Sequence, residues 1–169
     1  MIRLENYVDW IKKKHEGQKR KQGTPYYLHP VAVAKILKEK GFSEDYQIAG
    51  LCHDLLEDTE TTYEELLAMT NEHIAEAVKL VTKEKGYQQA DYMKRIQQHK
   101  MAHMVKLADR YHNLTETVLA DPKFQKKYIT ETKTWYLDLA KGTMFEQDIV
   151  AALQQVEQAY LAKEETERD

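Results

Sequence analysis

Apolar positions recur at steps of three and four residues along most of the chain, which places them on one face of a helix. The clearest stripes cover residues 4–11, 31–37, 48–56, 74–81 and 104–111. No convincing run alternates apolar with polar residues, as a half-exposed strand would. The pattern therefore predicts an all-α protein.

Glycine, proline and capping residues predict where the first helices begin and end. The first helix should end near Gly17. Pro30 suits the first position of the next, and Gly41 should stop it. Ser43 is expected to cap a helix that continues unbroken to residue 56.

Further capping signals divide the middle of the chain. A capping box is formed by Thr61 with Glu64, or by Thr62 with Glu65, and predicts a short helix. Asn71 is expected to cap another. The polar stretch that follows, residues 86–100, is expected to be partly helical and mobile.

The C-terminal part should add two helices, over about 123–141 and 145–163, and a frayed tail at 164–169. The chain has 169 residues and no visible linker or repeat. We therefore expect one helical-bundle domain over residues 1–163.

Composition and charge exclude several classes of protein. The formal net charge is −3, so no overall positive field indicates nucleic-acid binding. No uncharged apolar run reaches the roughly 18 residues of a membrane span, and the charged N-terminus does not look like a secretory signal. A single cysteine excludes an internal disulfide framework and suits the cytoplasm. We expect a cytoplasmic protein without nucleic-acid or membrane partners.

Three segments carry side chains that can hold a metal ion. They are His29, the pair His53-Asp54 and, in a later helix, Asp109, each preceded by apolar residues. Buried imidazoles and carboxylates are costly unless a partner or a metal compensates them. Two imidazoles and two carboxylates suit Mn²⁺, Fe²⁺ or Zn²⁺ better than Ca²⁺.

An acidic pair follows the central ligands at helical spacing. Glu57 and Asp58 lie four residues after His53 and Asp54, and should project from the same helix face one turn away. Carboxylates there can orient an attacking water and protonate a leaving oxygen.

Each feature also has a structural interpretation. Asp109 alone could simply pair with Arg110 or Lys106, and Glu57-Asp58 alone could be an acidic helix end that faces water. The combination of all these groups favours a metal-dependent hydrolase.

Basic residues concentrate near the N-terminus. Residues 1–40 hold 10 Lys/Arg and 4 Asp/Glu, a local charge of +6. Part of this excess lies in a glycine-bounded loop, Gly17-Gln-Lys-Arg-Lys-Gln-Gly23, from which basic side chains can reach an anionic ligand.

The ordered set His29, His53-Asp54 and Asp109 resembles the HD-domain metal-dependent phosphohydrolases, an all-α superfamily. The sequence around these residues is similar to the RelA/SpoT-type (p)ppGpp hydrolase domain, as found in the small, hydrolase-only proteins of that type. The matching segments are Gly17–Ala34, Leu51-Cys-His-Asp-Leu-Leu-Glu-Asp-Thr59, Val81-Thr-Lys83 and Val105-Lys-Leu-Ala-Asp-Arg-Tyr-His-Asn113.

This resemblance implies an HD-type helical bundle with the metal between helices. It implies Mn²⁺-dependent hydrolysis of guanosine 3′,5′-polyphosphate at the 3′-pyrophosphate, with release of pyrophosphate. The metal ligands would be His29, His53, Asp54 and Asp109, and the catalytic residues Glu57 and Asp58. The nucleotide contacts would be Arg20 against the guanine, Asn113 against the nucleoside, and Lys21 and Lys106 at phosphate or local charge.

One segment departs from the family. After Asn113 the family commonly continues Met-Arg-Thr, whereas this chain has Leu114-Thr115-Glu116. A basic residue is lost and an acid is gained. This motivates an alternative: the same metal site acting on another nucleotide or phosphoester. A third reading is a non-catalytic, metal-stabilised nucleotide-binding module, which would not need Glu57 and Asp58.

Overall fold

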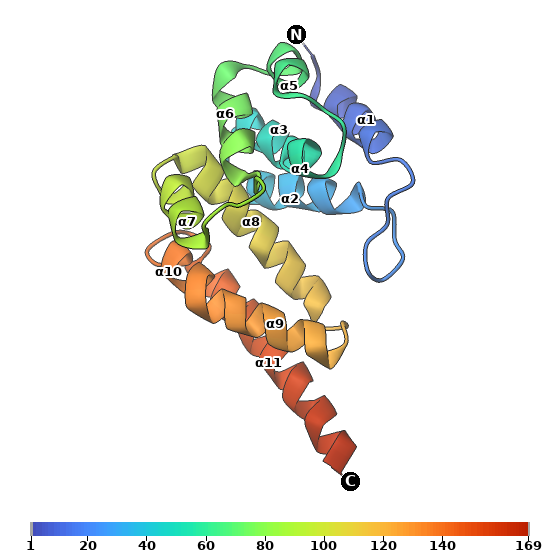
Figure 1. Ribbon diagram of the computed structural model, residues 1–169, viewed down its shortest axis with the longest axis vertical. Helices are drawn as coiled ribbons and strands as arrows, with labels where there is room; N and C mark the ends of the chain where they lie inside the picture. Colours follow the sequence, from blue (N-terminus) through green and yellow to red (C-terminus); the bar gives the residue numbers. More distant parts are fainter. Residues whose placement is uncertain (1, 169) are drawn as a thin grey trace. The chain divides into compact units, whose positions relative to one another are not determined.

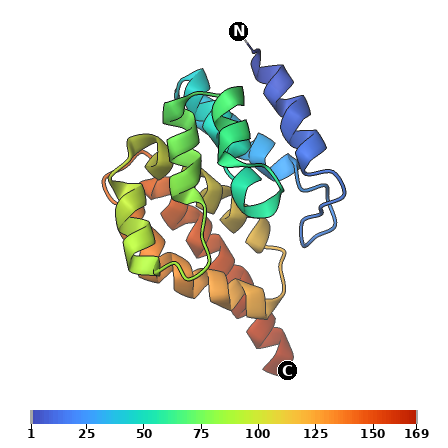
Figure 2. The ribbon, with the colours of Figure 1, turned by 45° about the horizontal axis from the view of Figure 1, so that its top comes forward.

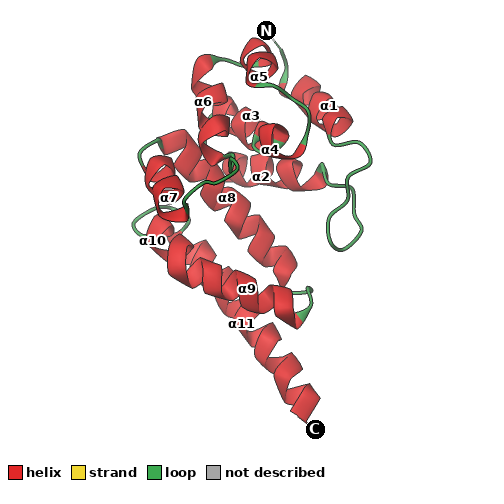
Figure 3. Cartoon of the chain, in the orientation of Figure 1, coloured by secondary structure: helices red, strands yellow, loops and turns green. Residues whose placement is uncertain are grey.

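The computed structural model describes residues 2–168, and every regular element within this range is a helix (Figure 3). The all-α prediction is confirmed. Contacts divide the chain into two compact units, Met1–Ala108 and Asp109–Asp169, with the division inside one continuous helix, α8 (Lys100–Thr117). The single domain that the sequence suggests stays a prediction.

The first unit contains seven complete helices of the described chain and the start of α8. They are α1 (Leu4–Lys14), α2 (Leu28–Glu39), α3 (Glu44–Cys52), α4 (Leu55–Asp58), α5 (Tyr63–Met69), α6 (Glu72–Val81) and α7 (Gln89–Gln97).

Helices α2 and α3 lie side by side (Figure 1, Figure 2) and form the centre of the first unit. Gly50 of α3 makes their close approach possible. A Cβ atom at this position would lie 2.9 Å from Leu37 Cδ1 and 3.3 Å from Val33 Cγ1, both on α2. Leu37 and Val33 are fully buried. The glycine thus fixes the spacing of the two helices that carry His29 and lead to His53.

The unbroken helix predicted over residues 43–56 is wrong. Helix α3 ends at Cys52, His53 and Asp54 form a turn, and the short helix α4 follows. The physical cause lies at Gly50, whose carbonyl accepts from the His53 ring Nδ1 at 2.6 Å and from the His53 backbone at 3.5 Å. Both contacts draw His53 toward the Gly50 carbonyl, and the chain turns at residues 53–54 instead of continuing the helix.

Local capping is mostly as predicted. Thr62 and Asn71 cap α5 and α6 through bonds from Glu65 N at 3.1 Å and Ile74 N at 2.9 Å. Ser43 precedes α3 without a side-chain capping bond. Other helix ends differ by a few residues: α1 ends at Lys14, before Gly17, and α2 begins at Leu28, which places His29 and Pro30 inside its first turn.

The polar stretch 86–100 contains a regular helix, α7, whose side chains Tyr92, Met93 and Ile96 are buried. The Tyr92 hydroxyl donates to the Val81 carbonyl at 2.6 Å. Apolar residues on one face of α7 therefore anchor a segment whose composition suggested mobility.

The second unit begins inside α8 and continues with α9 (Pro122–Glu131), a π-helical turn η1 (Thr132–Tyr136), α10 (Leu137–Ala140) and α11 (Glu146–Arg168). The expected helix over 123–141 is thus present but contains a π-helical turn. Helix α11 runs through most of the tail that was expected to fray. Arg110 is buried here, with its guanidinium carbon 4.3 and 3.9 Å from the ring centres of Tyr128 and Tyr136.

Within residues 2–168, no helix combines the length and apolar character that a bilayer crossing requires.

Candidate active site

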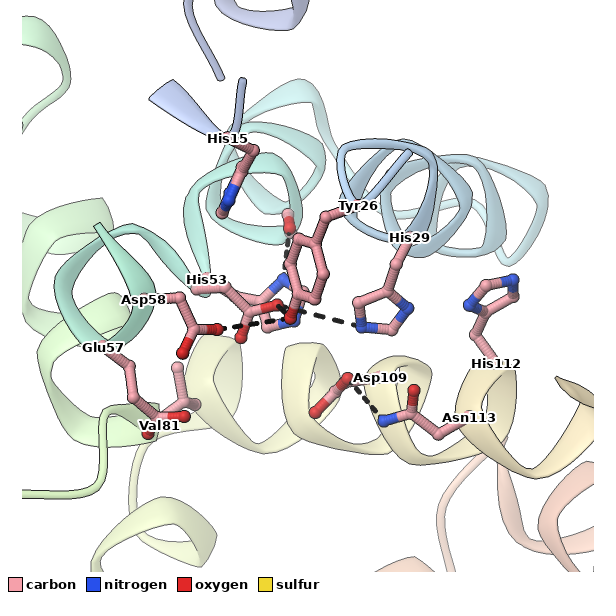
Figure 4. Close-up of polar contacts among 12 residues, drawn as sticks. His15, Tyr26, His29, His53, Glu57, Asp58, Val81, Asp109, His112 and Asn113 are labelled. Carbon is pink, nitrogen blue, oxygen red and sulfur yellow. Dashed lines mark hydrogen bonds and ion pairs between the residues drawn. The ribbon is translucent and has the colours of Figure 1, made fainter. Parts of the chain in front are cut away.

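Two histidines and an aspartate converge in the first unit (Figure 4). His53 Nε2 lies 3.0 Å and His29 Nε2 lies 4.0 Å from the same oxygen, Asp54 Oδ2. Both histidines are buried, at 4% and 2% exposure, and the Asp54 side chain is 14% exposed. The first turn of α2 thus supplies one imidazole, and the turn after α3 supplies the other imidazole and the carboxylate.

The hydrogen-bond pattern at His53 fits a metal ligand. Its Nδ1 faces the Gly50 carbonyl at 2.6 Å, so in the neutral ring Nδ1 carries the hydrogen and Nε2 presents a lone pair. That lone pair faces the Asp54 carboxylate at 3.0 Å. A proton or a metal cation between these two atoms would hold them this close. Ligands roughly 2.1 Å from one ion are about 3 to 4 Å apart, which matches both distances to Asp54 Oδ2. A carbonyl behind a ligating imidazole is also the usual support for such a residue.

A cluster of three carboxylates adjoins these histidines. Oxygens of Asp54, Glu57 and Asp58 lie within 4.8 Å of one another, although the turn at residue 54 separates α3 from α4. The Asp58 amide donates to the Asp54 carbonyl at 2.9 Å, which closes the turn that brings these residues together. Glu57 Oε1 accepts from the Lys83 backbone amide at 2.7 Å, so the segment after α6 orients this carboxylate.

Asp58 is exposed by surface area, yet protein atoms crowd around its carboxyl group. This loss of hydration, with the charges of Asp54 and Glu57, raises the pKa of Asp58 to about 6. A bound cation would oppose this shift because it favours the carboxylate form.

Tyr26 is a site residue that the sequence reasoning did not single out. Its hydroxyl donates to Asp54 Oδ2 at 2.6 Å and lies 3.2 Å from Asp58 Oδ2. It stands three residues before His29, inside the family-matching segment Gly17–Ala34.

A buried histidine lies next to Tyr26. The His15 and Tyr26 ring centres are 5.0 Å apart, and His15 is 2% exposed. His15 Nδ1 bonds Gln18 Oε1 at 2.9 Å, and Gln18 Nε2 donates to the Asp58 carbonyl at 2.7 Å. The end of α1 is thus connected to the acidic pair.

The basic loop forms a closed turn beside the same tyrosine. The Arg20 amide donates to the Thr24 carbonyl at 2.8 Å, and an isolated bridge pairs Lys19 with Pro25. The Arg20 guanidinium carbon lies 5.4 Å from the centre of the Tyr26 ring. Lys21 is exposed at the tip of the turn.

The remaining sequence-predicted residues lie on α8. In the second unit, Asn113 Nδ2 donates to Asp109 Oδ1 at 3.0 Å, so this amide orients the buried Asp109 carboxylate (Figure 4). In the first unit, Lys106 Nζ lies 5.6 Å from the Tyr92 ring centre. The Arg110 side chain contacts Tyr128, Tyr136 and Glu131, so it serves packing within the second unit.

Glu116, where this chain departs from the family pattern, lies beside a histidine. Glu116 Oε1 lies 3.1 Å from His112 Nδ1, one turn earlier on α8. The acid that this chain gains is therefore next to an imidazole, and both side chains are about one-fifth exposed.

Comparison with known proteins gives a consistent result. A family model described as the HD domain matches residues 8–143. A guanosine-3′,5′-bis(diphosphate) 3′-pyrophosphohydrolase of Danio rerio is 34% identical over 145 residues, which is 80% of this chain and 81% of that protein. An enzyme of the same name from Aquifex aeolicus is 37% identical over 145 residues, and the match covers 81% of this chain but only 21% of that protein.

Solved structures agree on the fold. One, described as a metazoan ortholog of SpoT that hydrolyzes ppGpp, matches with a TM-score of 0.78 and 23% identity over 89% of this chain and 93% of that one. A Listeria monocytogenes protein, lmo0812, matches with a TM-score of 0.58 and 24% identity over 82% of this chain. The HD-domain model matches residues 8–143, and the Danio rerio enzyme is 34% identical over most of both chains. The chain therefore belongs to the HD-domain hydrolase family, in the group that contains the guanosine-3′,5′-bis(diphosphate) 3′-pyrophosphohydrolases.

Proposed function

We propose that this protein hydrolyses guanosine 3′,5′-polyphosphate at the 3′-pyrophosphate and releases pyrophosphate, with Mn²⁺ as its metal. One observation carries the proposal: two imidazole nitrogens converge on one oxygen of Asp54 beside an acidic pair. The names of the relatives from Danio rerio and Aquifex aeolicus support the substrate.

His29, His53 and Asp54 would hold the cation, and we propose Asp109 as the fourth ligand. A bound divalent cation lowers the pKa of a coordinated water and polarises phosphoryl oxygens. In the neutral ring, the Gly50 carbonyl selects the tautomer with its hydrogen on Nδ1, which leaves the Nε2 lone pair for the cation. Asn113, whose amide bonds Asp109, would orient that ligand in addition to any contact with the nucleoside.

Glu57 and Asp58 would carry the proton transfers. One Glu57 oxygen accepts from the Lys83 amide, which leaves the other to orient an attacking water. Asp58 belongs to the same cluster of oxygens, where it can give a proton to the departing ribose oxygen or take one from water.

The basic loop would bind the nucleotide. Arg20 presents a planar guanidinium that suits stacking on a guanine as well as contact with phosphate, and Lys21 is exposed beside it. Lys106 is proposed to contribute local positive charge.

A nucleotide panel tests the substrate. Purified protein with Mn²⁺ should release pyrophosphate from guanosine 3′,5′-bis(diphosphate) and leave guanosine 5′-diphosphate, as measured by chromatography of both products. If the Mn²⁺-loaded protein hydrolyses other nucleotides of the panel but leaves guanosine 3′,5′-bis(diphosphate) intact, this substrate is rejected.

A second candidate keeps the metal site and changes the substrate to another nucleotide or phosphoester. The observation that favours it is Glu116, paired with His112 at the position where the family commonly has threonine. Faster turnover of a less negatively charged nucleotide in the same panel would support this candidate instead.

Substitution of the acidic pair tests catalysis against simple binding. Glu57→Gln and Asp58→Asn should each lower kcat by roughly 10²- to 10⁴-fold, while Mn²⁺ still binds because neither residue is a proposed ligand. Unchanged turnover in both variants would favour a non-catalytic role for the pair.

A further inference from the structure

The Tyr26 hydroxyl lies between two carboxylates that the proposed function uses differently. It donates to Asp54 Oδ2, a proposed metal ligand, at 2.6 Å, which is the length of a strong bond to an ionised carboxylate. It also lies 3.2 Å from Asp58 Oδ2, a proposed proton-transfer group.

This position has an electrostatic consequence. Two carboxylates within 4.8 Å repel each other and tend to rotate apart. A hydroxyl dipole shared by both offsets part of that repulsion. It holds Asp54 Oδ2 at the point on which His29 and His53 converge, and keeps Asp58 beside it.

The hydroxyl is itself fixed by the surrounding residues. The Tyr26 ring contacts the buried ring of His15 and the Arg20 guanidinium. Its amide donates to the Gln18 carbonyl at 2.9 Å, and the Gln18 side chain bonds the Asp58 carbonyl. These contacts therefore hold the Tyr26 hydroxyl in position before any ligand binds.

We propose that Tyr26 is a positioning residue that orients Asp54 for the metal and couples this ligand to Asp58. The proposal rests on the proposed function, since it takes Asp54 and Asp58 in the roles given there. It assigns Tyr26 no bond to metal or substrate.

The test removes only the hydroxyl. Tyr26→Phe keeps the ring against His15 and Arg20, so the fold should be retained, as checked by circular dichroism and thermal unfolding. Mn²⁺ affinity, measured from the electron paramagnetic resonance signal of the free ion, should fall by roughly tenfold to a hundredfold. At saturating Mn²⁺, kcat should also fall while KM for the nucleotide stays close to the wild-type value.

Tyr27→Phe is the matched control. It removes a hydroxyl from the adjacent tyrosine, whose ring contacts Lys12, and should leave Mn²⁺ affinity and kcat unchanged. Tyr26→Leu removes ring and hydroxyl together. If Phe behaves like the wild type and only Leu impairs metal binding, the ring and not the hydroxyl is responsible, and the proposal is overturned.

The metal measurement separates this proposal from the substrate assignment. A chain that binds Mn²⁺ but hydrolyses no guanosine polyphosphate rejects the proposed substrate, while the affinity of Tyr26→Phe still decides the role of Tyr26. Equal Mn²⁺ affinity in Tyr26→Phe and wild type overturns the positioning role, whatever the substrate. A wild-type chain that binds no Mn²⁺ overturns both.

Discussion

On the scale of single residues, His15 shows how a polar group is accommodated in the interior. Its Nδ1 bonds Gln18 Oε1, which as a carbonyl oxygen can only accept, so Nδ1 carries the hydrogen. Its Nε2 is buried without a hydrogen-bond partner among the described residues. Burial lowers the pKa of His15, although the Gln18 bond and the charge of Asp54 oppose this shift. The residue is therefore held in the neutral form.

This lowered pKa predicts an acid-sensitive fold. An unfolded histidine has a pKa near 6.5, so below about pH 6.5 the unfolded chain takes up a proton that folded His15 resists. The free energy of unfolding should decrease as the pH falls from about 7 toward 5. His15→Asn, which keeps an N–H for Gln18, should reduce that decrease, as measured by denaturant unfolding across this range.

The exposed His73 provides the control for this measurement. His73→Asn should reduce the decrease less than His15→Asn does, because His73 is exposed and acts only through His99, whose ring is 5.0 Å away and whose pKa it lowers. If His15→Asn instead shows the same loss of stability on acidification as the wild type, protonation of His15 does not contribute to it.

On the scale of elements, the crossing of α2 and α3 at Gly50 sets the position of the histidines. Gly50→Ala would favour the helix by up to about 1 kcal/mol through intrinsic propensity. Its Cβ, however, meets the fully buried Leu37 at 2.9 Å. Because overpacking a core costs about 1 to 3 kcal/mol, we expect a net loss of stability in denaturant unfolding, with weaker Mn²⁺ binding as α3 shifts.

A double-mutant cycle tests this cause. Leu37→Ala removes the atom that the new Cβ would meet, so the two changes together should cost less than the sum of the single changes. Additive costs, or a Gly50→Ala variant as stable as the wild type, would mean that the contact with α2 does not limit this position.

The sequence predicted those elements whose ends depend on neighbouring residues. Thr62 and Asn71 cap helices through amides three residues ahead, which is a local signal. The break after Cys52 was not predictable in this way, because it depends on the His53 ring reaching the Gly50 carbonyl. The π-helical turn at 132–136 was also missed; it places Tyr136 against the buried Arg110, a contact between separate helical segments.

On the scale of the whole molecule, the chemistry comes from segments far apart in the chain. The sequence identified His29, His53 and Asp54, and the structure brings these three together within the first unit. It did not identify Tyr26, because a tyrosine before a helix has many ordinary uses and only the folded chain shows its two carboxylate contacts. Residue type thus indicated the proposed ligands, but not the residue that we propose orients them.

Metal binding should stabilise the whole protein, since an ion that binds only the folded state adds RT ln(1 + [L]/Kd) to its stability. This is about 2.7 kcal/mol at a hundredfold excess over Kd. Mn²⁺ should therefore raise the midpoint of thermal unfolding, and a chelator should remove the increase.

At the same Mn²⁺ concentration, Asp109→Asn should show a smaller increase, because a proposed ligand loses its charge. The exposed Asp138 of the second unit serves as control, and Asp138→Asn should keep the full increase. If Asp109→Asn is stabilised by Mn²⁺ as much as the wild type, Asp109 is not a ligand, and the metal depends on the first unit alone.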